Sequence, residues 1–145
     1  PALPHRWQLA GDVDGWWLDT SGFDLGSLAA WRHRVPLPEA LARVVDTLDP
    51  RGRVGGFRLG HRQGEWLARA ALHEVEVSPW EQAPGGGPLD MWVEARDFTG
   101  RVSFVGAQGA TLHFPELFGA PMALDHAGGE VLWAYDGPRT LVRGR

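Results

Sequence analysis

The chain has 145 residues, of which 14 are basic and 18 acidic, so its net charge is -4, and it contains no cysteine. The missing cysteine excludes a disulfide framework, a thiolate zinc site and a cysteine nucleophile, and the net negative charge argues against a general attraction to nucleic acid. A chain of this length can bury a sizeable core, so we expect one globular domain over residues 1–145.

The composition also bears on source and compartment. Ile, Lys and Asn, whose codons are rich in A and T, are absent, which is typical of a GC-rich bacterial genome. No stretch reaches the roughly 18 consecutive apolar residues of a membrane-spanning helix. The first residues lack the basic segment and apolar run of a secretory signal. We therefore expect a cytoplasmic protein.

Two kinds of element are expected in the first third of the chain. Arg6–Ala10 and Trp16–Thr20, separated by a Gly- and Asp-rich reversal, predict a β-hairpin. A short helix is expected over Leu25–Arg34. The main helix is expected over Pro38–Leu48, where Leu41, Val44, Val45 and Leu48 form one apolar stripe at helical spacing.

After residue 50 the apolar pattern changes to a period of two. Strands are predicted over the ranges Arg53–Leu59, Trp66–Val77, Met91–Arg96, Arg101–Val105, Ala110–Phe114, Glu130–Tyr135 and Arg139–Arg143. The second of these changes face part-way, which a β-bulge near Ala70–Ala71 would explain. A helix over Glu65–Leu72 is the alternative. The Gly- and Pro-rich stretch 78–90 is expected to be a mobile surface loop.

These elements predict an α+β fold. The expected architecture is a twisted antiparallel β-sheet or half-barrel of six to eight strands, packed with one main amphipathic helix and one short helix. Short connections require neighbouring strands to be antiparallel, because a parallel crossover needs a dozen or more residues.

No motif for catalysis or phosphate binding is present. The sequence has no G-x-S-x-G, no H-E-x-x-H, no P-loop and no G-x-G-x-x-G that opens a helix. A small hydrolase or metal-dependent enzyme built from His113, Glu94 and His126 is one alternative, and single-stranded nucleic-acid binding through the Arg51–Arg62 region is another. The absence of these motifs favours a protein that is not an enzyme, and no cofactor or metal is expected.

The most specific candidate site follows from the hairpin register between residues 91 and 114. A four-residue loop at 97–100 would pair Arg96 with Arg101, and a three-residue loop at 107–109 would bring Ser103 opposite His113. Met91, Val93, Ala95, Val102 and Phe104 then share an apolar face. The opposite, polar face carries the candidate ligand-binding residues Trp92, Glu94, Arg96, Arg101, Ser103 and His113.

A tryptophan among polar side chains is typical of a ligand pocket or a docking surface. The sequence thus favours an uncharacterised bacterial module that binds a ligand or a protein partner, without catalysis, through the polar face around Trp92. The eight tryptophans also exceed what a small core readily hides, and an exposed aromatic patch would suggest a homodimer.

Overall fold

The computed structural model describes residues 6–27, 46–80, 84–136 and 139–144. These residues form nine strands, which are β1 (Trp7–Asp12), β2 (Gly15–Asp24), β3 (Arg51–Arg62), β4 (Glu65–Val77), β5 (Gly85–Arg96), β6 (Thr99–His113), β7 (Met122–Ala123), β8 (Gly128–Asp136) and β9 (Arg139–Gly144). All nine belong to one sheet.

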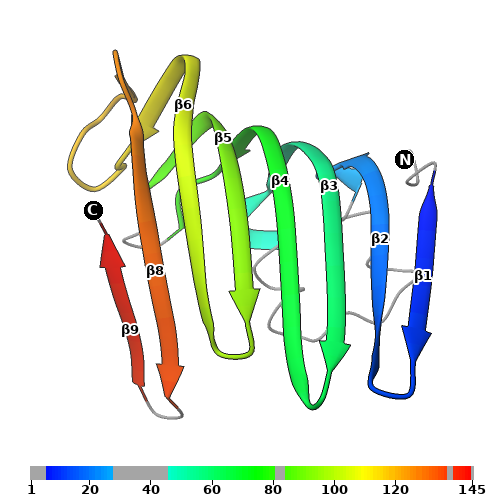
Figure 1. Ribbon diagram of the computed structural model, residues 1–145. Coiled ribbons are helices and arrows are strands. Elements are labelled where there is room, and N and C mark those ends of the chain that lie inside the picture. Colours follow the sequence, from blue (N-terminus) through cyan, green and yellow to red (C-terminus); the bar gives the residue numbers. More distant parts are fainter. Residues whose placement is uncertain (1–5, 28–45, 81–83, 137–138, 145) are drawn as a thin grey trace.

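The sheet is a meander of antiparallel strands. Its order is β1-β2-β3-β4-β5-β6-β8-β9, and the short strand β7 pairs with the far part of β6. Figure 1 shows the eight long strands side by side, with β1 and β9 at opposite edges. Each long strand pairs with the long strands next to it in the chain. The two-residue turns at 13–14, 63–64 and 97–98 require antiparallel neighbours, because they are too short for a parallel crossover.

The prediction of an α+β fold is wrong. In the described part of the chain, helical geometry is limited to Ser27 and Asp46–Leu48, and no helix reaches seven residues. Most of the predicted helices, over 28–34 and 38–45, lies outside the described residues. The alternative helix over Glu65–Leu72 is also wrong, because β4 pairs along this stretch with both β3 and β5. The helix propensity of these residues contributes little free energy, and hydrogen bonding of the strand to a neighbour on each side outweighs it.

The first three hairpins confirm the predicted strand pairs but are tighter than expected. The first hairpin turns at residues 13–14, the second at 63–64 and the third at 97–98. Gln63 and Gly64 have φ values of 51° and 86°, and Asp97 has a φ of 46°. These left-handed conformations are those of two-residue hairpin turns, which continue the twist of the flanking strands.

Irregular pairing is concentrated at the end of the sheet opposite these hairpins. The bulge predicted at Ala70–Ala71 lies a few residues later, where the β4–β5 register shifts between Leu72 and Val75 and Glu74 adopts a φ of 53°.

The loop predicted over 78–90 is wrong for its second half, because Gly85–Asp90 begin β5. Gly87 has a φ of 133°, and a side chain there would collide with the backbone at Val75 and Glu76. Glycine thus permits the strand at this point.

The core of this sheet is small. Among the described residues, the buried apolar side chains are Leu25, Val54, Val75 and Ala110, and the first three form one cluster near the bulges. The accessible surface is 10186 Å², whereas a compact monomer of 15.9 kDa exposes about 7,400 Å². The chain as a whole therefore exposes more surface than a compact monomer of its mass.

Candidate binding faces of the sheet

Strand register sorts the side chains onto a polar and an apolar face. Trp92 lies opposite Ser103, and Glu94 lies opposite Arg101. Directly opposed residues of an antiparallel pair share a face. The predicted grouping of Trp92, Glu94, Arg96, Arg101 and Ser103 on one face is thus reproduced. The predicted pairs differ by two residues, because the turn occupies residues 97–98 rather than 97–100, and a shift of two keeps every side chain on its face.

The corrected register separates two arginines, Arg96 and Arg101, that the predicted register places directly opposite each other, where like charges would repel. Arg96 lies opposite Thr99, not opposite Arg101, and its Nε is 3.9 Å from the Glu65 carboxylate. Arg101 instead faces Glu94, with 2.5 Å between Arg101 Nη2 and Glu94 Oε2. No external anion is therefore needed to hold these arginines together.

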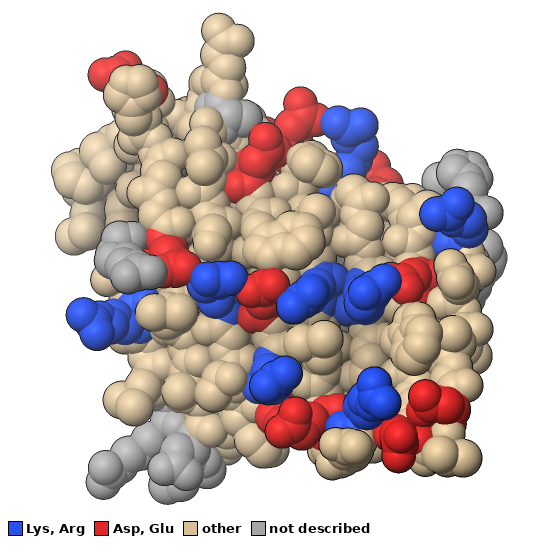
Figure 2. All heavy atoms as spheres, in the orientation of Figure 1, with Lys and Arg blue, Asp and Glu red and all other residues tan. Residues whose placement is uncertain are grey.

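A row of charged side chains crosses the polar face from strand to strand. We call it the charged row, and it consists of Asp19, Arg58, Arg69, Glu94 and Arg101, which occupy consecutive positions from β2 to β6. Figure 2 shows it as a band of basic and acidic side chains across the middle of the molecule. Cross-strand neighbours of opposite sign stabilise such a sheet modestly.

Within the charged row, Asp19 and Glu94 each hold basic partners. Arg58 makes two hydrogen bonds to Asp19, at 2.6 and 3.0 Å, and these raise the pKa of Arg58. The Arg69 Nε lies 3.3 Å from Glu94 Oε1. The hydrogen bond from Arg101, followed by one from the Trp92 indole, lowers the pKa of Glu94. Glu94 is therefore ionised at neutral pH and holds two arginines, Arg69 and Arg101.

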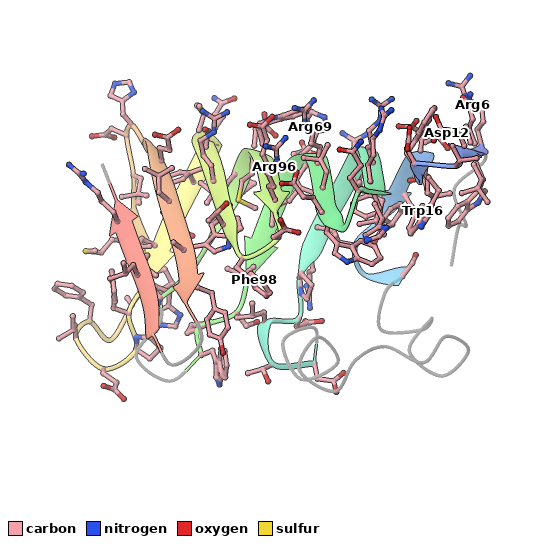
Figure 3. The ribbon with its side chains drawn as sticks, turned by 60° about the horizontal axis from the view of Figure 1, so that its bottom comes forward. Arg6, Asp12, Trp16, Arg69, Arg96 and Phe98 are labelled. Carbon is pink, nitrogen blue, oxygen red and sulfur yellow. The ribbon has the colours of Figure 1, made fainter. Side chains whose placement is uncertain are left out.

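Trp92 is the aromatic centre of this face. Its side chain is 44% exposed, and its neighbours across the strands, Ala71 and Ser103, are small. The polar edge of its indole also contributes to lowering the pKa of Glu94. One row away, a hollow of about 460 Å³ is lined by residues that include Leu67, Arg69, Arg96, Arg101 and Leu132. In Figure 3, Arg69 and Arg96 project from the same side of the sheet.

His113 does not join this group. It lies opposite Gly85, seven positions before Trp92 along β5, which corresponds to a distance of about 20 Å. The predicted pairing of Ser103 with His113 is wrong, because β6 continues through residues 107–109 as one strand and Ser103 instead faces Trp92 and Glu130. A reaction that uses His113 with Glu94 is therefore not supported by their positions.

The other two alternatives gain no geometric support. In the part of the chain that the structure describes, no group of three or more histidine, aspartate and glutamate side chains is placed to hold a metal ion. In the Arg51–Arg62 region each arginine has a carboxylate within 4 Å, the partners being Asp49, Glu74, Asp19 and Asp14. This surface consequently presents ion pairs rather than an uncompensated basic patch.

The apolar face carries two adjacent rows that run across all eight long strands. The first row is Leu9, Leu18, Leu59, Ala68, Ala95, Gly100, Trp133 and Val142, and the second is Trp7, Thr20, Phe57, Ala70, Val93, Val102, Val131 and Gly144. Thr20 is the one polar side chain in them, and its buried Oγ1 has no hydrogen-bond partner among the described residues. At about 4.8 Å per strand the rows extend for roughly 34 Å.

The centre of the apolar face is lined by small residues. Ala68, Ala95 and Gly100 are consecutive in the first row, with Leu59 on one side and Trp133 on the other. The indole of Trp133 lies where a side chain on Gly100 would be. Alternation in the sequence identified part of this face and predicted that it belongs to the core. The continuity of the rows across β1 to β9 could not be predicted without the register of every strand.

Comparison with known proteins assigns the chain to a family. The family profile described as YhdP protein matches residues 2–144. The chain belongs to the YhdP family. No curated protein and no solved structure matches it. In the parts of the chain that are described, no helix has the length and apolar character needed to cross a membrane.

Proposed function

We propose that the chain is a non-catalytic binding module that holds an apolar ligand, of the long-hydrocarbon type, on the apolar face of its sheet. The observation that carries the proposal is the pair of uncharged rows, which extend across every long strand. Ligand sites are commonly lined by apolar side chains, and large accessible apolar surfaces mark places where something binds.

The dimensions of the rows favour an extended ligand over a compact one. The rows are long and narrow, and the side chains at their central positions Ala68 and Ala95 are small. The Trp133 indole lies over the third small residue, Gly100, and adds an aromatic surface to the face. Burial of hydrocarbon provides about 0.8 kcal/mol per CH₂ group, so a chain of ten or more carbons would bind without any polar contact.

The direct test compares two neighbouring residues of β6 that lie on opposite faces. The probe is a fluorescent long-chain fatty acid. Val102→Asp places a charge in the second apolar row and is expected to weaken probe binding at least tenfold. Ser103→Asp adds the same charge on the polar face and should leave binding unchanged. Far-UV circular dichroism establishes that both variants are folded.

Two results would contradict this proposal. One is the absence of saturable binding of the probe to the wild-type chain at micromolar concentration. The other is an equal loss of binding in the Ser103→Asp variant, which would show that the probe responds to the total charge and not to one face.

A second candidate function uses the polar face, and the exposed Trp92 ring among small neighbours favours it. Exposed tryptophans are frequent centres of protein interfaces. In this alternative the site comprises Trp92, Glu94, Arg96, Arg101 and Ser103, and the partner is a protein segment that covers the indole.

Trp17 supplies a matched control for this second candidate, because it lies on the same face and its side chain is 39% exposed. Peptides that are selected from a displayed library on the wild-type chain should lose binding to Trp92→Ala and keep binding to Trp17→Ala. Equal loss in both variants, or loss in neither, would exclude a docking site centred on Trp92.

A further inference from the structure

A hollow on the polar face brings three arginines together. It has a volume of about 460 Å³ and lies where β4, β5, β6 and β8 run side by side. Its lining includes Arg69, Arg96 and Arg101, and among the described residues that line it Glu94 is the one acid. With three positive charges and one negative charge, the lining has an excess of two positive charges.

The register of the strands explains why the arginines meet here. Glu94 on β5 lies opposite Arg69 of β4 on one side and opposite Arg101 of β6 on the other. Arg96 follows Glu94 by two positions on the same strand, so its side chain leaves the same face of the sheet. Figure 3 shows Arg69 and Arg96 on this side of the ribbon. Each arginine is therefore a neighbour of Glu94, across or along the strands.

The carboxylates around the three arginines leave many of their donors unused. In each guanidinium group Nε lies near a carboxylate, at 3.3 Å in Arg69, 3.9 Å in Arg96 and 3.6 Å in Arg101. These carboxylates belong to Glu94, Glu65 and Glu130, of which the last two do not line the hollow. Among the described residues, the terminal amino groups of Arg69 and Arg96 make no hydrogen bond. Several N–H donors of the lining are thus available to an anion.

We propose that this hollow binds the phosphate group of a small phosphate monoester, which accepts hydrogen bonds from Arg69, Arg96 and Arg101. A phosphate group presents three oxygens in a tetrahedral arrangement, so arginines from neighbouring strands can each reach a different oxygen. A carboxylate has its two oxygens in one plane and would leave one guanidinium group without a partner. A phosphate monoester also carries about two negative charges at neutral pH, which match the excess charge of the lining.

Apolar side chains at the hollow favour an organic monoester over inorganic phosphate. Leu67 lies opposite Arg96, Leu132 lies opposite Arg101, and both leucines line the hollow. A small organic group attached to the phosphate can cover one of these leucines while the phosphate contacts the arginines. The site does not depend on either proposed function, because its arginines lie on the face opposite the apolar rows and its lining does not include Trp92.

Titration calorimetry with phenyl phosphate tests the site, and Arg96 is the residue to change. Its side chain is 67% exposed and its ion pair with Glu65 is 3.9 Å long, so Arg96→Gln should fold like the wild type. The wild-type chain should bind phenyl phosphate saturably, and Arg96→Gln should weaken this binding about tenfold or more. Arg53→Gln removes the same charge from a side chain that is 68% exposed and outside the hollow, and it should bind like the wild type.

Three results of this comparison would overturn the proposal. The first is the absence of saturable binding to the wild-type chain. The second is an Arg96→Gln variant that binds as tightly as the wild type. The third is an equal loss in Arg53→Gln, which would show that phenyl phosphate responds to the total charge of the chain and not to the hollow.

Two other anions and two further variants identify the chemistry of the ligand. Benzoate should bind about tenfold more weakly than phenyl phosphate, because it lacks the third oxygen and the second charge. Inorganic phosphate should bind about threefold more weakly, and Leu132→Ala should weaken phenyl phosphate alone, because the ring covers the leucine. Trp92→Ala should leave all three affinities unchanged. Benzoate that binds as tightly as phenyl phosphate, or a loss of binding in Trp92→Ala, would contradict the assignment of a phosphate site to this hollow.

Discussion

The two faces of the sheet are made by the same strands but are held in different ways. On the polar face, Asp19 and Glu94 fix the arginines of the charged row, and water screens every one of these contacts. On the apolar face, side chains are held by contact with their neighbours, as Trp133 is held over Gly100. We therefore expect substitutions on the apolar face to change stability strongly, and those on the polar face to change it weakly and in a manner that depends on pH and salt.

The largest difference is expected between two neighbours in β3. Phe57 is on the apolar face and packs against the core cluster, whereas Arg58 is on the polar face. Phe57→Ala should lower the free energy of unfolding by about 2–4 kcal/mol, because it removes packed apolar surface. Arg58→Ala should lower it far less. Urea denaturation measures both, and equal losses would show that the faces do not differ as described.

A smaller difference is expected between two glycines. A Cβ added to Gly100 would overlap the Trp133 ring, and one added to Gly56, on the polar face, would meet nothing within 4 Å. Gly100→Ala should therefore destabilise the chain by about 1–3 kcal/mol through overpacking. Gly56→Ala should be neutral or stabilising by about 0.5 kcal/mol. Thermal melts of the two variants decide this, and a harmless Gly100→Ala would mean that Trp133 moves freely.

The smallest effect is the pH dependence of the polar face. The pKa of Glu94 is lowered in the folded chain, chiefly by Arg101. Its contribution to stability is thus fully present above the pKa of the unfolded side chain, about 4.3, and is lost as the pH falls through the lower folded value. Glu94→Gln should therefore lose less stability in acid than the wild type does. Phe57→Ala, on the other face, should lose as much stability in acid as the wild type. Acid titrations followed by circular dichroism measure this difference. If Glu94 contributes nothing, the profiles of Glu94→Gln and the wild type will coincide.

The sequence predicted the half of the sheet with tight turns well. Val93, Val102 and Phe104 were assigned to one face and Trp92, Glu94 and Arg101 to the other, and these assignments survived an error of two residues in the register. Alternation has a period of two, so a shift of two positions leaves the faces unchanged. A shift of one would have reversed them.

The opposite half could not be predicted by the same rule. Gly85, Gly86 and Gly87 have the composition of a loop, yet they extend β5 because neighbouring backbone at Val75 and Glu76 comes too close to Gly87 for a side chain. Residues 107–109 resemble a turn but lie within β6. These departures depend on contacts between strands distant in sequence, which no local pattern records.

By itself the sequence determined which side chains share a face wherever strands run regularly, because alternation is a local property of extended backbone. Only the tertiary structure decided that Asp19, Arg58, Arg69, Glu94 and Arg101 form one charged row, and that apolar positions from Leu9 to Val142 form continuous rows behind it. The physical reason is that a row perpendicular to the strands depends on the register of every hairpin and bulge at once, and hydrogen bonding between strands sets that register.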